Sequence, residues 1–418
     1  SYYSTLKEID GRIFATLCTQ KRGFFEKDGY ENYVSDSTGF IFTRAAPLIP
    51  KREGWPEFTT IDSLKGTIIQ KFETDKSLFQ KREIYTKISL DNGKSWSNLR
   101  IKDPENKESY SCDVDEDENC SLNTRGPFFS WDQENYLDRT LGILTAIGSV
   151  STSKVFDYDN QQTYISRDGG ISWSKIFDFP VKIEFGDHGN IIVATSNYWG
   201  RTRDAGTVYY SLDQGYTWSE LPFGSRMSDS FVSAFENDGS GSVFRIYSYS
   251  DSCTYIIDFG KAFGGRTCSE SDFEDWYQSN GECVNGARYK FKRRKHDAQC
   301  LAKKSFKEIE RVEEPCACTK KDYECSPGFS SNKKGECVLD YSLLDSSKLC
   351  DGSVDTLHLA PTVLTTSNKC WNPLAIDLAE VSCKELGVRK SKHKTRENTF
   401  NLETCVSWLR SLLFVWFP

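Results

Sequence analysis

Ser89-Leu-Asp91-Asn-Gly93-Lys-Ser-Trp96 is the clearest indication of the fold, because its pattern returns further along the chain. The residue types suit a hairpin turn: Ser and Asp oxygens accept backbone N–H groups, and Gly takes the positive φ that other residues resist. The Trp then folds back as an apolar plug between neighbouring sheets. The key residues of the clear copies are Ser89, Asp91, Gly93 and Trp96, then Ser166, Asp168, Gly170 and Trp173, then Ser211, Asp213, Gly215 and Trp218.

The spacing of these motifs, which we call Asp-boxes, predicts a β-propeller. With a degenerate copy included, the boxes span 35–42, 89–96, 166–173 and 211–218 and start 54, 77 and 45 residues apart. A blade of about 45 residues fits this spacing. The widest gap holds an acidic insertion closed by Cys112 and Cys120, and from about residue 220 a further strand-rich unit follows without a box. We therefore expect a mainly β protein with about five propeller blades in residues 1–265.

The chemistry of the boxes favours a structural role over metal binding. One carboxylate per turn is poor against the six to eight oxygens that calcium takes, and the acidic loop 112–120 lacks the Gly and Glu of an EF-hand. No His lies in a metal-binding spacing, and neither a nucleophile elbow nor a phosphate-binding loop occurs. We expect no catalytic residue, no cofactor and no metal. Carboxylate pairs of a glycosidase stay open, because 60 acidic residues offer many combinations.

Composition narrows the class of protein. The chain has 418 residues, enough for two or three domains, and 14% aromatics, which is typical of a folded, strand-rich chain. A net charge of −7 argues against nucleic acid as a partner, since that partner needs a basic footprint. No apolar run is long enough for a complete transmembrane helix. The chain starts with neither Met nor a signal-type segment, so we expect its N-terminus to be processed or missing.

Cysteine usage predicts an oxidised second region. Of 15 cysteines, 11 lie in the last 151 residues, and their spacing lacks the paired C-x-x-C rhythm of zinc sites. Crowding of this kind is typical of small disulfide-stapled modules of the secretory pathway. We expect a ten-cysteine disulfide module in residues 266–385. Because the cysteine count is odd, at least one thiol is left over, and Cys18 or Cys405 is the favoured candidate.

Residues 386–418 differ in character from the rest of the chain. A basic linker, 390–396, precedes an apolar stretch, 406–417, that is too short to span a bilayer. This tail could contact a membrane interface through its Trp residues, or it could be the remnant of a longer segment. Two other features are expected at the surface: the basic run 288–295 as a solvated hairpin, and the sequon at Asn119 as a glycosylation site.

Three stretches in this order resemble the luminal domain of sortilin-type vacuolar sorting receptors, the fungal group included. The insertion 112–120 is similar to the small disulfide insertion of that propeller. Residues 255–276 are similar to the exit from its last blade. Residues 281–329, with Cys316-Ala-Cys318, are similar to the start of its ten-cysteine module.

The resemblance implies a receptor-like luminal protein that sorts vacuolar or lysosomal hydrolases or peptides between Golgi and endosome. The family's propeller has ten blades, so the chain resembles a truncated member that keeps the last half of the ring. The implied location is the lumen of the secretory pathway, associated with Golgi, endosome or vacuole membranes. Alternatives are a non-functional or regulatory remnant of such a receptor and an Asp-box glycosidase of the sialidase type.

The resemblance also implies individual residues. The implied disulfides are Cys112–Cys120, Cys268–Cys300, Cys283–Cys316, Cys318–Cys370, Cys325–Cys337 and Cys350–Cys383. They leave Cys18, Cys253 and Cys405 outside the set. The family's peptide site corresponds loosely to the segment with Lys51 and Arg52, where a cation could pair with a peptide carboxylate.

Overall fold

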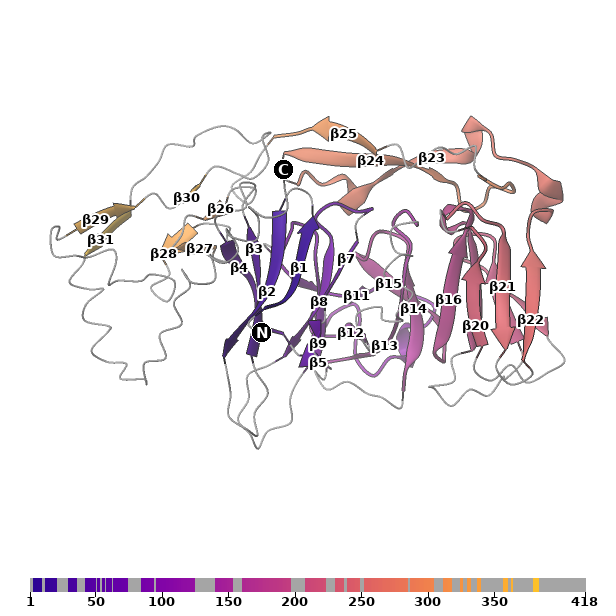
Figure 1. Cartoon of the computed structure of the whole chain (residues 1–418), viewed down its shortest axis with the longest axis horizontal. Helices are drawn as coiled ribbons and strands as arrows, with labels where there is room; N and C mark the ends of the chain where they lie inside the picture. Colours follow the sequence, from indigo (N-terminus) through magenta and orange to yellow (C-terminus); the bar gives the residue numbers. More distant parts are fainter. Residues whose placement is uncertain are drawn as a thin grey trace. The chain divides into compact units, whose positions relative to one another are not determined.

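The structure of the chain is a computed structural model, shown in Figure 1. It describes residues 3–9, 12–20, 29–35, 42–49, 51–52, 55–56, 58–61, 63–73, 84–93, 95–124, 140–152, 160–196, 207–222, 230–236, 239–248, 252–284, 286–303, 311–317, 324–325, 329–331, 337–339, 356–359, 362–363 and 379–382. The chain forms two compact units, one of Ser1–Tyr323 with Leu364–Asn372 and one of Glu324–Val363 with Pro373–Pro418.

The first unit opens with five antiparallel sheets that follow one another along the chain, as the propeller prediction requires (Figure 1). The first sheet contains β1 (Tyr3–Ile9), β2 (Arg12–Gln20), β3 (Gly29–Ser35) and β4 (Phe42–Ile49). The second contains β7 (Phe58–Thr60), β8 (Ile68–Glu73), β9 (Ile84–Ser89) and β10 (Ser97–Asn98). The third contains β12 (Ser121–Thr124), β13 (Leu144–Ser151), β14 (Gln162–Ser166) and β15 (Ser172–Phe177), with β11 (Arg100–Ile101) added parallel to β15.

The fourth and fifth sheets complete this series. The fourth contains β16 (Val181–Gly186), β17 (Ile191–Ser196), β18 (Thr207–Ser211) and β19 (Ser219–Pro222). The fifth contains β20 (Ser230–Ala234), β21 (Val243–Ser248) and β22 (Cys253–Asp258). Each clear box lies between the third and fourth strand of its sheet, and the fifth sheet is the unit that has no box. The fold is therefore a mainly β chain with five blade-like sheets.

The core lies between successive sheets. Leu99, Leu122, Leu144, Tyr164 and Trp173 form one cluster and are each at most 1% exposed. Other clusters join the third sheet to the fourth and the fourth to the fifth. Both clusters contain alternate residues of β17. Ile192 and Ala194 belong to the cluster between the third and fourth sheets, and Ile191 and Val193 belong to the cluster between the fourth and fifth sheets. Because successive strand residues point to opposite faces, β17 packs against a neighbouring sheet on each side.

The start of the cysteine module belongs to the same unit as the blades. Here β23 (Phe273–Tyr277), β24 (Ala287–Arg294) and β25 (Arg311–Pro315) form an antiparallel sheet. The first unit also contains a short ladder of β5 (Lys51–Arg52) and β6 (Trp55–Pro56). The second unit contains two-stranded ladders of β26 (Glu324–Cys325) with β30 (Thr362–Val363), β27 (Phe329–Ser331) with β28 (Cys337–Leu339), and β29 (Thr356–Leu359) with β31 (Ala379–Ser382).

A search of the described residues for a helix of membrane-spanning length and apolar character finds none. The apolar stretch 406–417, for which the sequence left membrane contact open, lies outside the described residues.

Candidate functional site

Each of the three clear Asp-boxes is a turn in which the Ser and Asp side chains bind the backbone. In the first, Ser89 Oγ donates to Asp91 Oδ1 at 2.8 Å and accepts the Gly93 N–H at 2.8 Å. Asp91 Oδ1 also accepts the Ser95 N–H at 2.9 Å, and Trp96 Nε1 donates to the Gly93 carbonyl at 3.1 Å. Gly93 has a φ of +80°, which explains why the turn requires Gly.

The same contacts recur in the other two clear boxes. Asp168 accepts Ser166 Oγ at 2.8 Å and the Ser172 N–H at 2.9 Å. In the third box, the pKa of Asp213 is lowered, because hydrogen bonds from Thr217 and Ser211 to its carboxylate outweigh the burial that would raise it. Hydrogen bonds of the turn itself reach both oxygens of each carboxylate, so the geometry is that of a structural turn.

The degenerate box at 35–42 is described only at its first and last residues. Ser35 ends β3, and its Oγ accepts the Ile13 N–H at 2.8 Å. Phe42 begins β4, and residues 36–41 lie outside the described part of the chain.

Arg167 links the second clear box to the third, a role that the box motif does not predict. Its Nε donates to the Gln214 carbonyl at 3.0 Å, its Nη2 donates to the Gly215 carbonyl, and its guanidinium lies 4.1 Å from the Tyr216 ring. Burial is the largest influence on its pKa and lowers it. The box motif allows any residue between its Ser and its Asp. The role of Arg167 at this position therefore becomes apparent only from the packing of adjacent sheets.

Three of the six implied disulfides are present in the structure. Cys112–Cys120 closes the acidic insertion, and Cys268–Cys300 and Cys283–Cys316 lie in the module. The other three pairs each include a cysteine whose side chain lies outside the described part, so they stay predictions. Cys253 lies exposed in β22 and Cys18 lies in β2, whereas Cys405 is outside the described residues.

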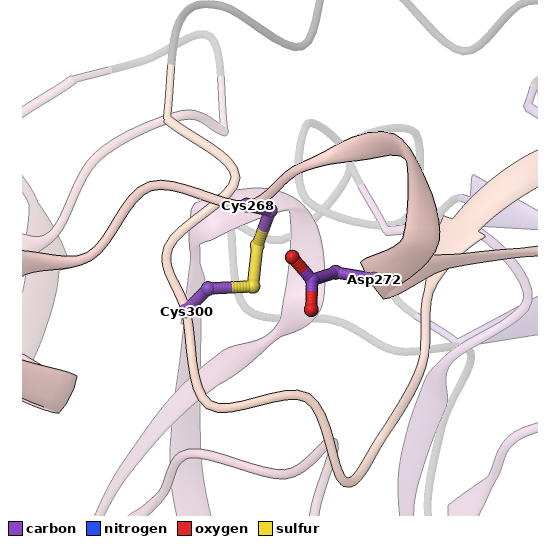
Figure 2. Close-up of side chains that lie close together, drawn as sticks. All are labelled: Cys268, Asp272 and Cys300. Atoms are coloured by element: carbon purple, nitrogen blue, oxygen red, sulfur yellow. A yellow bond between two sulfur atoms is a disulfide. The ribbon is translucent and has the colours of Figure 1, made fainter.

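One side-chain cluster of the described residues has the composition of a metal site, but its chemistry does not fit one. Figure 2 shows Cys268, Asp272 and Cys300, whose ligand atoms lie within 4.8 Å of one another. The two sulfurs form a disulfide and are not thiolates. Hydrogen bonds from Arg266, then from Ser269, lower the pKa of Asp272. The carboxylate therefore serves the ion pair with Arg266 at 2.9 Å and the turn that begins at Ser269.

The module is anchored on the blades by Trp276 in β23. A Cβ placed on Gly142 would lie 2.6 Å from the Trp276 ring, and one on Gly169 would lie 3.6 Å from it. The indole therefore occupies a socket that two glycines leave open in the third sheet. Beside it, Gln278 Nε2 donates to the Lys65 carbonyl at 2.6 Å in the second sheet.

The prediction of a solvated hairpin at 288–295 is wrong for Phe291 and Arg294, whose side chains are buried. Phe291 is 2% exposed and Arg294 is 1% exposed. Arg293 Nη1 donates to the Arg167 carbonyl at 2.8 Å, so it reaches the second box. Arg294 Nη2 donates to the Leu212 carbonyl of the third box. Strand alternation places Arg293 and Arg294 on opposite faces, yet both reach carbonyls of the boxes, because their side chains are long enough to extend to acceptors in distant segments.

Two cations of this sheet are paired with acids of the neighbouring strands. Lys290 lies 3.4 Å from Asp275 and 3.4 Å from Glu314, and Arg293 lies 3.1 Å from Glu274. These pairs offset two of the positive charges in the run 288–295.

A buried carboxylate also links the cysteine module to the blades. Asp187, which is 0% exposed, accepts the Ala302 N–H at 3.0 Å and the Lys303 N–H at 2.7 Å. Its own N–H donates to the Gly241 carbonyl at 2.8 Å in the fifth sheet. The residues after Cys300 are thereby bound to the turn between β16 and β17.

The two residues proposed for ligand binding form the short strand β5. Lys51 and Arg52 pair with Pro56 and Trp55, respectively, of β6. Their side chains lie outside the described part of the structure, so no partner is assigned to them.

Comparison with known proteins identifies the family. The family model Sortilin-Vps10, described as sortilin, neurotensin receptor 3, matches residues 2–230, and the corresponding C-terminal model matches residues 235–383. The vacuolar protein sorting/targeting protein PEP1 of Saccharomyces cerevisiae is 36% identical over 94% of this chain and 26% of its own length. An uncharacterized membrane glycoprotein of Saccharomyces cerevisiae is 40% identical over 61% of this chain and 25% of its own length.

Among solved structures, the sialidase of Trypanosoma rangeli is 14% identical, covers 70% of this chain and 52% of its own, and has a TM-score of 0.25, too low to support an argument. The chain spans about a quarter of the length of the curated relatives that it matches. The matching family models and the PEP1 relative are described as receptors and a sorting protein and not as enzymes, which argues against the glycosidase alternative. The chain belongs to the sortilin/Vps10 family.

Proposed function

We propose that this chain acts as a luminal, receptor-like binding module that captures hydrolase precursors or peptides for delivery to the vacuole or lysosome. The observation that carries the proposal is the order of the two family matches, propeller-type then C-terminal-type, over residues 2–230 and 235–383. The PEP1 relative is named a vacuolar protein sorting/targeting protein, and its match covers 94% of this chain.

The architecture supports a binding role. Box turns, the Arg167 bridge and the docked β23–β24 hairpin hold successive sheets in fixed relation within the first unit. A rigid scaffold of this kind positions surface loops for recognition, and such loops commonly carry function. The ligand site that we propose is the β5–β6 ladder, where Lys51 and Arg52 would pair with a peptide carboxylate.

A capture experiment tests both statements. The purified chain is immobilised and exposed to precursors of vacuolar hydrolases, and bound precursor is compared with bound mature enzyme. We expect selective capture of precursors and at least a tenfold loss of affinity in the double variant Lys51→Ala with Arg52→Ala. Arg288→Ala, an exposed cation on β24, is the matched control. Unchanged affinity of the double variant would refute the site alone, whereas no capture by the wild-type chain would refute the function.

The location follows from the same family assignment. We propose that the protein resides in the lumen of the secretory pathway, where its disulfides persist. Asn119 is exposed on the insertion and is the proposed glycan acceptor, but Cys120 beside it is 4% exposed and in a disulfide. Glycan transfer must then precede closure of that disulfide. Glycopeptide mass spectrometry should find higher occupancy of Asn119 after Cys112→Ser, and equal occupancy would contradict this order of events.

We also propose that the blades end near residue 265 and the cysteine module extends over 266–385, ahead of a basic linker and apolar tail. The short gap between β22 and the Cys268–Cys300 disulfide supports a boundary there.

A further inference from the structure

The fifth sheet ends in an edge strand that no other strand of the described residues covers. This sheet has three strands, β20, β21 and β22, whereas the sheets before it have four or five. β22 is the last strand of the series, and within the described residues it pairs with β21 alone (Figure 1). An uncovered edge presents backbone N–H and C=O groups to which a further strand can bind.

The last strand of each preceding sheet is protected against such pairing. In the first sheet, β4 contains Pro47, which has no N–H, and its register against β3 is irregular. In the second sheet, β10 has only two residues. In the third, β11 covers β15, and in the fourth, β19 carries the exposed charge of Glu220 and ends in Pro222. Prolines, short strands, irregular register, charges and covering segments are the ordinary means by which proteins block edge pairing.

β22 lacks these protections. It is six residues long, contains no proline and keeps a continuous register with β21 from Cys253 to Asp258, which is its only charged residue and lies at its end. Tyr255 and Ile257 pack in the cluster shared with the fourth sheet, whereas Ile256 points to the opposite face and is 64% exposed. A regular strand with this exposure is suited to accept a further strand.

We propose that β22 pairs antiparallel with β22 of a second copy of this chain, so that the two fifth sheets join into one continuous sheet. A two-fold axis at Ile256 places this residue opposite the partner's Ile256, Tyr255 opposite the partner's Ile257, and Thr254 opposite the partner's Asp258. Aromatic and β-branched residues are favourable cross-strand neighbours, and in this register no like charges face each other. The strand is therefore complementary to itself, as a two-fold symmetric contact requires.

This contact is separate from the proposed ligand site on β5 and β6. Self-association is measured without any ligand, so its test does not depend on the proposed function, and either proposal can fail alone. Because a contact through one strand is small, we expect a reversible dimer and not a permanent one.

Sedimentation equilibrium of the purified chain tests the dimer. We expect the dimer fraction to rise between about 1 µM and about 100 µM. Ile256→Lys places like charges opposite each other at the two-fold axis and should weaken the association at least tenfold. The matched control is Phe235→Lys, because Phe235 is 50% exposed on the same sheet but lies next to β20, away from the edge. The control should associate as the wild type does.

The opposite outcomes overturn the proposal. A monomer at every concentration would show that the edge does not pair with a second copy, and would leave it to an extended peptide of another protein. A dimer that Phe235→Lys disrupts and Ile256→Lys does not would show that the copies meet through the face of the sheet and not through its edge.

Cysteine crosslinking tests the register. In a Cys253→Ser background, Ile256→Cys should form a covalent dimer when copper phenanthroline is added as the oxidant, because directly opposed residues lie within disulfide reach. Thr254→Cys in the same background is the control, since the proposed register separates it from the partner's Thr254 by about 13 Å. Non-reducing gels should show the covalent dimer for Ile256→Cys well above the Cys253→Ser background. Equal crosslinking of the two variants, or none of either, would refute the two-fold axis at Ile256.

Discussion

At the scale of single residues, the turn of each clear Asp-box depends on the carboxylate of its Asp. Asp168 accepts the side chain of Ser166 and both the N–H and the hydroxyl of Ser172. Replacement by Ala leaves these donors without their acceptor in a part-buried turn, and hydrogen bonds to a charged group contribute about 1.5–3 kcal/mol each. We expect Asp168→Ala to lower the free energy of unfolding by about 2–4 kcal/mol, measured by denaturant titration.

The control for this prediction is an acid on the same sheet that makes only a surface contact. Asp178 is 75% exposed and pairs with Lys175 at 2.8 Å. Surface pairs contribute about 0–1 kcal/mol, so Asp178→Ala should change stability little. Equal losses in the two variants would show that the box carboxylate has no special role.

The glycine socket of Trp276 is the second residue-level case. Gly142 has a φ of +71°, and an added Cβ would lie 2.6 Å from the indole. Gly142→Ala should therefore cost both backbone strain, about 1 kcal/mol, and overpacking of about 1–3 kcal/mol. In a Trp276→Ala background the overpacking should vanish and only the strain should remain, as a double-mutant cycle will measure.

Gly264 offers the matched comparison for the socket. Its φ is +67°, and nothing lies within 4 Å of an added Cβ. Gly264→Ala should cost the backbone strain alone and should be insensitive to Trp276→Ala. An additive cycle between Gly142 and Trp276 would contradict the close approach.

At the scale of elements, the β23–β24 hairpin is held at its end by the disulfide Cys268–Cys300. This bridge joins residues 32 apart, whereas Cys112–Cys120 joins residues 8 apart. Loop-closure entropy then predicts a loss of about 3.7 kcal/mol when the first is removed and about 2.5 kcal/mol for the second. Paired Cys→Ser variants, compared by denaturant titration, should keep this order.

Proteolysis gives the disulfide prediction a second readout. Removal of Cys268–Cys300 frees the segment that Asp187 binds through Ala302 and Lys303, so cleavage after the basic residues of β24 should become faster. Removal of Cys112–Cys120 should leave β24 protected. The reverse order of stability or of cleavage would show that the insertion, and not the hairpin, holds the unit together.

At the scale of the whole molecule, carboxylates with lowered pKa values make the stability of the fold depend on pH in the acid range. The pKa values of Asp213 and Asp272 are both lowered in the folded protein. Each carboxylate therefore stabilises the fold at pH values above its unfolded-state pKa of about 4. This stabilisation is lost as the pH falls through the folded-state pKa. We expect the difference in unfolding midpoint between wild type and Asp213→Asn to stay constant from pH 7 to pH 5. The difference should shrink below pH 4, and a difference that shrinks between pH 7 and pH 5 would contradict this assignment.

The rest of the disulfide set is also a property of the whole chain. Peptide mapping under non-reducing conditions should find Cys318–Cys370, Cys325–Cys337 and Cys350–Cys383 beside the three bridges already present. Cys316 is joined to Cys283, which leaves Cys318 to serve a different partner. A bridge from Cys405 into the module would refute the predicted set.

The repeating part of this protein can be predicted from its amino-acid sequence. Box chemistry is local: the Ser, Asp, Gly and Trp of each turn contact one another within eight residues, so the motif alone predicted the turn and the spacing predicted the blades. The family resemblance supplied the pairings 268–300 and 283–316, which spacing alone leaves among many combinations.

The contacts between the module and the blades could not be predicted from the sequence and depend on the packing of distant segments. Charge predicted that the run 288–295 faces solvent, yet Arg293 and Arg294 reach carbonyls of two different boxes. Arg167 and Asp187 also find partners 47 and 115 residues away. The local sequence determines which side chains lie on each face of a strand. The carbonyl groups that accept hydrogen bonds from a buried charge come from distant segments. They exist as a site only once those segments have packed together.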